Sequence, residues 1–156
     1  IRNEIQVVVT VLSYDMANDP DVLGIVAASL ALSLSDIPWD GPVAGVRVGR
    51  TKLDVGENEN QFIINPTFEQ RATSDLDIIV AGTAQKINML EAGAKEIPED
   101  TMIEAIAAGQ KAYEELIAFQ NEIVEELKPQ KRTLDIKEIP AEFKTKIIKF
   151  LNILNN

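Results

Sequence analysis

The chain has 156 residues, of which 46% are hydrophobic and 26% are charged, and its net charge at pH 7 is −10. This composition is typical of a folded domain and not of a disordered segment; the acidic balance argues against nucleic-acid binding by this segment alone, because phosphate contacts require clustered cations. There is no Cys, which excludes disulfides and thiolate metal sites, and no His, so any metal would have to bind carboxylates.

The hydropathy of the chain and its first residues bear on its cellular compartment and on whether it is part of a longer protein. No signal peptide and no apolar run long enough to span a membrane is visible, so we expect a cytoplasmic protein. The chain begins with Ile1 and not with Met, directly on strand-like sequence. We therefore expect a piece of a longer polypeptide.

The first quarter of the sequence predicts a buried strand and a buried helix. Residues 5–12 (IQVVVTVL) form a β-branched run with little alternation, which is typical of a central strand covered on both faces. A helix then begins at Asp19 and Pro20, with Asp19 as N-cap and Pro20 in the first helical position, and extends to about residue 35. This helix is apolar nearly all round, so we expect it to be packed on two sides.

The middle of the sequence predicts two pairs of strands. Residues 42–50 and 61–65 form the first pair, joined by an acidic tip at residues 54–60. Residues 76–82 and 87–92 form the second pair. With the helices on either side, this order indicates an α+β or α/β protein with a mixed sheet.

The last third of the sequence predicts a long helix, a linker and a further helix. The long helix begins at residues 98–100 and ends at Lys128 and Pro129, and its apolar stripe comprises Met102, Ile106, Gly109, Tyr113, Leu116, Gln120, Ile123 and Leu127, widened by Ile103, Ile117 and Val124. A linker follows at 129–139. From Pro140 a helix carries Phe143, Ile147, Phe150, Leu151 and Leu154 on one face, and we expect it to begin another domain, giving the division 1–128, 129–139 and 140–156.

Few residues have a pattern that could support chemistry. Asp75 and Asp77 flank Leu76 where a strand begins, so both side chains leave the same face and could share a divalent cation. The alternative, which we favour, is that one carboxylate caps the strand and the other is solvated. Lys128, Lys131 and Arg132 are interpreted as a solvated linker. With no phosphate loop and no His to activate a Ser, chemistry alone indicates a non-enzymatic segment.

Three stretches, in order, resemble the first core domain of the polynucleotide phosphorylase family. They are residues 2–12 (RNEIQVVVTVL), residues 28–49 (ASLALSLSDIPWDGPVAGVRVG) and residues 64–95, which contain INPT, SDLDIIVAGT and MLEAGAKEI. The resemblance implies an α+β fold of the ribonuclease PH type (like domain 2 of ribosomal protein S5), with a mixed sheet and packed helices followed by a helical extension. The segment from Arg50 to Gln61 is longer than the family leads us to expect.

The resemblance also implies what the parent protein does. It is expected to degrade RNA from the 3′ end with phosphate, in mRNA degradation, using magnesium or manganese. It is expected to form a homotrimeric ring, with RNA as partner and neither DNA nor membrane. Each subunit of the family carries two such domains in tandem, and the working active site belongs to the second one.

Departures from the family pattern indicate that this segment is inactive. Residues 18–21 (NDPD) stand where working members have a hydroxyl-rich phosphate loop. Only Asp77 of the metal-binding set is retained, because Arg71 and Ile79 stand where working members have Asp and Lys. We therefore expect no catalytic residue and no metal here, and a structural role beside the RNA channel. Arg2, Arg47 and Arg50 are the candidates for contact with RNA.

Two other interpretations stay open. A free-standing, non-catalytic subunit of an exosome-like ring would share the inactive site but would lack the helix that begins at Pro140. A small scaffold or interaction domain unrelated to RNA is compatible with the acidic charge, but it leaves the three ordered motifs unexplained.

Overall fold

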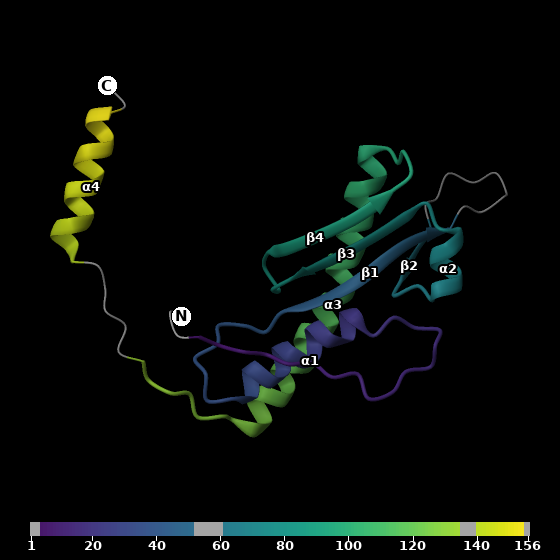
Figure 1. The fold of residues 1–156 in the computed structure, drawn as a ribbon, viewed down its shortest axis with the longest axis horizontal. Helices are drawn as coiled ribbons and strands as arrows, with labels where there is room; N and C mark the ends of the chain where they lie inside the picture. Colours follow the sequence, from purple (N-terminus) through teal and green to yellow (C-terminus); the bar gives the residue numbers. More distant parts are fainter. Residues whose placement is uncertain (1–3, 52–60, 135–139, 155–156) are drawn as a thin grey trace.

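A computed structural model of the chain describes residues 4–51, 61–134 and 140–154 (Figure 1). In chain order the elements are α1 (Asp21–Leu34), β1 (Ala44–Thr51), β2 (Gln61–Ile64), α2 (Phe68–Thr73), β3 (Leu76–Gly82), β4 (Ile87–Ala94), α3 (Glu99–Leu127) and α4 (Ala141–Leu154).

One four-stranded sheet, in the order β2-β1-β3-β4, organises the domain. The two predicted strand pairs, β1 with β2 and β3 with β4, are confirmed, while the acidic tip at 54–60 lies outside the described residues. The α+β class is confirmed as well. The expectation of a mixed sheet is wrong for the described strands, because β1–β2, β1–β3 and β3–β4 all pair in antiparallel register.

The hydrophobic core lies between the sheet and α3. Val48 of β1 and Val80 of β3 face the middle of this helix at Gly109, where an added Cβ would lie 3.0 Å from Val48 Cγ2 and 2.9 Å from Val80 Cγ2. A Cβ at this position would crowd both valine side chains, so glycine favours this close approach of helix to sheet. Further along the helix, Tyr113 and Ile117 fill the space beneath the strands and are buried.

The buried stripe of α3 is rotated slightly from the predicted one. Gly109, Tyr113 and Gln120 are buried as expected, but Ile103 is 63% exposed and Leu127 61% exposed. Thr101, Ala105 and Ile117 complete the buried stripe. Small side chains at four-residue spacing decide the rotation, because they let the helix backbone approach the sheet.

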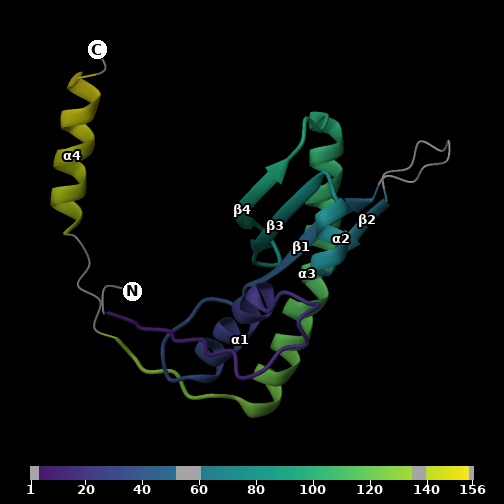
Figure 2. The ribbon, with the colours of Figure 1, turned by 45° about the vertical axis from the view of Figure 1, so that its right-hand side comes forward.

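Helix α1 packs beside β1 and α3, near one end of the sheet (Figure 2). It begins at Asp21, one residue later than predicted, with Pro20 in the N-cap position. The carboxylate of Asp19 still accepts a hydrogen bond from the Asp21 backbone N–H, at 3.2 Å. The Cδ1 atom of Ile25 reaches the sheet at Gly45, where an added Cβ would be 3.1 Å away.

The prediction of a central strand at residues 5–12 is wrong for this structure. The segment has no strand assignment and runs as an extended stretch across α1 (Figure 1). On one face Val8 is 73% and Leu12 93% exposed, and on the other, which lies toward α1, Val9 and Val11 are still 51% and 52% exposed, so neither face is buried. A β-branched run favours strand geometry, but strand formation also needs a hydrogen-bonding neighbour, and both described edges of the sheet, β2 and β4, lie elsewhere.

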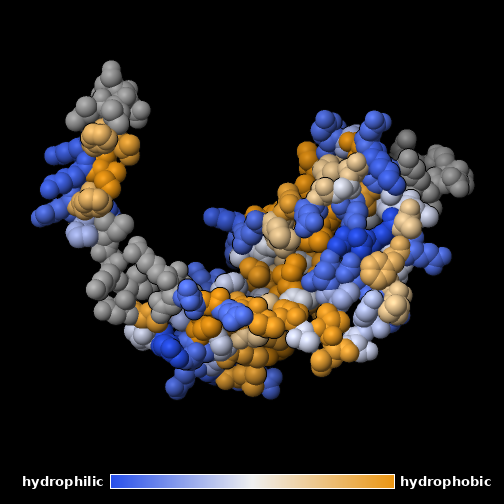
Figure 3. All heavy atoms as spheres, viewed as in Figure 1, coloured by the Kyte–Doolittle hydropathy of each residue, from blue (hydrophilic) through white to orange (hydrophobic). Residues whose placement is uncertain are grey.

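Of the two remaining helices, α4 was predicted from the sequence and α2 was not. The short helix α2 was not predicted, although Thr67 and Gln70 form a reciprocal capping box at its start. The predicted helix after Pro140 is present as α4, which stands clear of the sheet in Figures 1 and 2. Its Phe143 and Phe150 are more than half exposed, and Figure 3 shows its apolar side. None of the described helices is long and apolar enough to cross a membrane.

Candidate functional site

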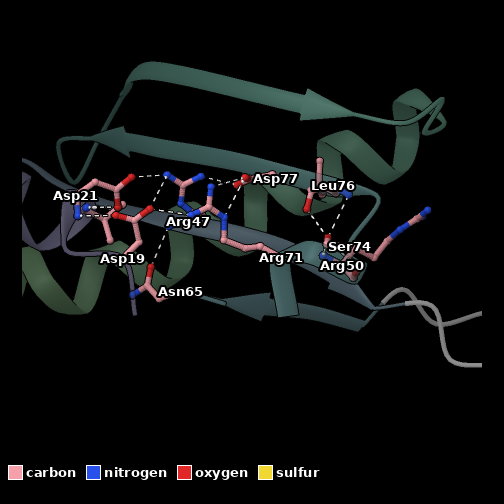
Figure 4. Close-up of polar contacts among 10 residues, drawn as sticks. Asp19, Asp21, Arg47, Arg50, Asn65, Arg71, Ser74, Leu76 and Asp77 are labelled. Atoms are coloured by element: carbon pink, nitrogen blue, oxygen red, sulfur yellow. Dashed lines mark hydrogen bonds and ion pairs between the residues drawn. The ribbon is translucent and has the colours of Figure 1, made fainter. Parts of the chain in front are cut away.

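Five charged side chains meet on the face of the sheet opposite α3, and we call them the charged cluster (Figure 4). Arg47 comes from β1 and Asp77 from β3. Arg71 comes from α2, and Asp19 and Asp21 come from the start of α1. The cluster therefore joins four elements that are distant in sequence.

Arg47 lies at the centre of the charged cluster. Its Nη1 donates to Asp77 Oδ1 at 2.6 Å, and its Nη2 donates to the carboxylate of Asp21 and lies 3.7 Å from Asp19 Oδ2. Its backbone N–H donates to Asn65 Oδ1 at 2.9 Å. Burial by itself would lower the pKa of Arg47, but the carboxylates of Asp77 and Asp21 outweigh it and hold the pKa above its usual value. The arginine is thus fixed in its charged form.

Arg71 links the other side of the same carboxylates. Its Nε and Nη2 donate to Asp77 Oδ2 at 3.1 and 2.9 Å, and its Nη1 donates to Asp19 Oδ2 at 2.7 Å. The guanidinium carbon lies 5.7 Å from the centre of the Phe68 ring, a distance at which cation–π attraction adds to the placement. Both oxygens of Asp77 therefore accept from arginines, one from Arg47 and the other from Arg71.

This arrangement does not fit a divalent cation. Three carboxylates and two guanidinium groups leave a formal charge of −1, and each carboxylate already accepts a charge-assisted hydrogen bond from an arginine. The guanidinium of Arg71 lies between Asp19 and Asp77, where a cation would have to be held. Within the described ranges, no group of three or more Asp, Glu, His or Cys is placed to hold a metal ion.

The start of α1 offers little to a phosphate group. Helix N-termini bind anions through free backbone N–H groups, but here Asp21 N–H donates to Asp19 Oδ1 at 3.2 Å and Val22 N–H donates to Asp21 Oδ1 at 2.6 Å. Pro20 has no N–H to donate. The two acidic side chains thus satisfy the amides and also place negative charge where an anion would lie.

The remaining predicted residues have definite places. Ile79 lines a hollow beside Arg47, Arg71 and Asp77, and it is 8% exposed. Asp75 does not join Asp77, because its carboxylate accepts from Arg50 Nε at 2.9 Å and is 8% exposed. The favoured alternative of a capping and a solvated carboxylate is therefore wrong for both residues, since each is held by arginine.

The three candidates for RNA contact are placed differently. Arg2 lies outside the described residues. The side chains of Arg47 and Arg50 are 11% and 13% exposed and bind carboxylates within the chain. The hydrogen bond with Asp75 is the main cause that raises the pKa of Arg50. Contact of these arginines with RNA stays a prediction.

Sequence reasoning missed the partners within the charged cluster. Asp19 and Asp21 were interpreted as residues that start a helix and stand in place of a phosphate loop, and Arg71 as a departure from a family pattern. Arg71 and Asp19 are 52 residues apart in the sequence, so no local spacing predicts that they pair. The one local signal is the capping box at Thr67, which starts α2 and so orients Arg71.

Residues 41–112 match the family described as "3′ exoribonuclease family, domain 2". They contain β1 to β4, α2 and the first half of α3, so the matched part includes the sheet and the arginines of the charged cluster. The ribonuclease PH-type fold implied by the sequence motifs is confirmed by this match.

Polyribonucleotide nucleotidyltransferases of several bacteria are similar to nearly the whole chain. That of Shouchella clausii is 46% identical over 146 residues, which is 94% of this chain and 20% of the relative. That of Exiguobacterium sibiricum is 54% identical over 123 residues, which is 79% of this chain and 16% of the relative. That of Streptococcus gordonii is 46% identical over 151 residues. The predicted resemblance is thus confirmed, and the chain spans about a fifth of the length of these relatives.

Proposed function

We propose that the chain is a non-catalytic structural segment of a polyribonucleotide nucleotidyltransferase, a phosphate-dependent 3′-to-5′ exoribonuclease. The observation that carries the proposal is that every carboxylate of the charged cluster is bound by an arginine. Asp77, the retained member of the expected metal-binding set, is bound by Arg47 and Arg71. A carboxylate whose oxygens are held by two guanidinium groups is not available to a metal ion.

The wider role follows from the same proposal. The parent enzyme would act on RNA in the cytoplasm, with magnesium or manganese bound at another domain, and would assemble as a homotrimer. The helix α4 supports this reading over a free-standing ring subunit, which we expect to lack it. For Arg47 or Arg50 to contact RNA, the guanidinium group would have to exchange Asp77 or Asp75 for a phosphate.

The full-length enzyme provides the test of catalytic silence. We replace Asp77 by Asn, which keeps the size of the side chain and removes its charge, and measure phosphate-dependent release of ADP from poly(A). Glu91→Gln is the matched control, because Glu91 lines the same hollow. We expect both variants to keep turnover within about twofold of the parent, since a general acid, base or metal ligand contributes about a hundredfold or more.

A structural failure has to be separated from a chemical one. The thermal transition and the oligomeric mass of each variant are therefore measured alongside turnover. If Asp77→Asn keeps both and still loses turnover by about a hundredfold, the segment takes part in catalysis and the proposal is wrong.

A further inference from the structure

The carboxyl-terminal end of α1 is bound by a lysine from a distant part of the chain. The last turn of α1 contains no basic residue of its own, and the final carbonyl groups of a helix have no partner within it. Lys131 Nζ donates to the carbonyl oxygens of Leu32, Ser33 and Ser35 at 3.1, 2.7 and 2.9 Å. An ammonium group thus uses its three donors on the negative end of one helix.

The next residue makes a second attachment to the same place. The Arg132 backbone N–H donates to the carbonyl oxygen of Asp36 at 2.7 Å, and Arg132 Nε donates to Asp36 Oδ2 at 3.0 Å. The two side chains are 66% and 53% exposed, so their ion pair by itself contributes little. The backbone hydrogen bond matters more, because it fixes the path of the chain and not only a side chain.

Around this attachment three separate segments come together. A cleft of about 350 Å³ lies between Glu4 and Ile5 of the extended first segment, Asp36 and Ile37 after α1, and Leu134. The chain reaches it after turning at Lys128, whose left-handed conformation (φ 46°) ends α3. The residues after α3 therefore do not continue the helix axis but pass the carboxyl-terminal end of α1.

We propose that Lys131 and Arg132 form a clamp that holds residues 129–134 on the end of α1. The clamp makes these residues part of the folded domain, so the chain leaves the domain at Leu134 and not at Lys128. Lys131 and Arg132 are exposed, as the interpretation of them as solvated linker residues expects, but both also have partners within the chain. The proposal does not depend on the function proposed above.

Amine reactivity in the full-length protein tests the clamp without a variant. Lysines are acetylated under limiting reagent, and the rates at Lys131 and Lys128 are compared by mass spectrometry. Lys128 is the internal reference, because it is exposed and lies three residues away. We expect Lys131 to react at least about tenfold more slowly, since its charge-assisted hydrogen bonds must break first. Equal rates would overturn the proposal.

Two matched variants of the full-length protein test the consequence for the backbone. Lys131→Met removes the lysine of the clamp, and Lys128→Met removes the same charge nearby. We expect hydrogen exchange at the Arg132 amide to accelerate about tenfold in Lys131→Met and to stay unchanged in Lys128→Met. Lys131→Arg, which keeps the charge, is expected to lie between them. The proposal fails if Lys131→Met leaves exchange unchanged or if both Met variants accelerate it equally.

Global unfolding would accelerate exchange everywhere, so the amides of β3 are followed in the same samples. If Lys131→Met also accelerates exchange in β3 by the same factor, the variant reports on the whole domain. The amine reactivity of the unmodified protein then decides the question by itself.

Discussion

The charged cluster predicts a large structural cost for one substitution, Arg47→Met. Methionine keeps an apolar stem of similar length but has no donor. The change removes the arginine partner of Asp21 and one of the two arginine partners of Asp77. Removing one member of a buried ion pair typically costs about 3–5 kcal/mol, because a charge is left uncompensated.

The exposure of the carboxylates lowers this figure. The Arg47 side chain is 11% exposed, but those of Asp77 and Asp21 are 32% and 37% exposed, so water solvates them in part once the arginine is gone. Arg71 also keeps its hydrogen bonds to Asp77. We therefore expect a loss of about 2–3 kcal/mol in the free energy of unfolding of the domain.

Hydrogen exchange of the β1 and β3 amides in the full-length protein measures this loss without requiring the segment to fold alone. A loss of about 2–3 kcal/mol corresponds to exchange roughly 30 to 150 times faster. Arg132→Met is the matched control, because the Arg132 side chain is 66% exposed and neither Arg132 nor its partner Asp36 belongs to a strand. If Arg47→Met changes exchange in β1 and β3 by less than about twofold, the cluster does not stabilise the fold and the reasoning is refuted.

Three other predictions concern the core and the isolated chain. In chemical denaturation, Gly109→Ala should lower the free energy of unfolding of the domain by about 1–2 kcal/mol, because crowding against Val48 and Val80 outweighs the gain in helix propensity. Gly24→Ala is the control, because its added Cβ meets only Val9, at 3.5 Å. This variant should be neutral or stabilising by up to about 1 kcal/mol. Burial and the charge of Glu114 raise the pKa of Tyr113. The stability that the protonated Tyr113 hydroxyl contributes is therefore fully present below pH about 10, which is the pKa of tyrosine in the unfolded chain. This contribution is lost as the pH rises above that value. Tyr113→Phe should abolish this alkaline loss in pH-dependent denaturation and change stability little at neutral pH, because the hydroxyl has no hydrogen-bond partner among the described residues. The isolated chain should release no ADP from poly(A) with phosphate and magnesium or manganese, and robust turnover by a clean preparation would contradict the inactive site.

Much of the secondary structure follows from local pattern. The strands β1 and β3 are predicted within two residues of their observed bounds, because apolar residues that form strands are concentrated there and turn residues flank them. Helix α3 is also predicted, since its apolar period extends over many turns and prolines flank it. In each case the local sequence is sufficient to predict the element, because tertiary packing favours the same secondary structure.

Other local patterns were overruled or too short to detect. Residues 5–12 have high strand propensity, yet they lie on α1 without a strand partner. Propensity describes a single segment, while a strand needs a neighbour that only the fold supplies. Helix α2 has six residues, which is too short for a helical period to stand out, and its capping box was the only local signal.

The family resemblance and the loss of the expected site residues were determined by the sequence, because motifs and substitutions are visible residue by residue. Only the tertiary structure decided what replaced that site. Arg47 meets Asp77 across 30 residues, Arg71 meets Asp19 across 52, and Lys131 meets Ser33 across 98. Charge pairing has no period along the chain, since it depends on which elements the packing of apolar residues brings together. The sequence therefore shows which charges are present, and the fold selects their partners.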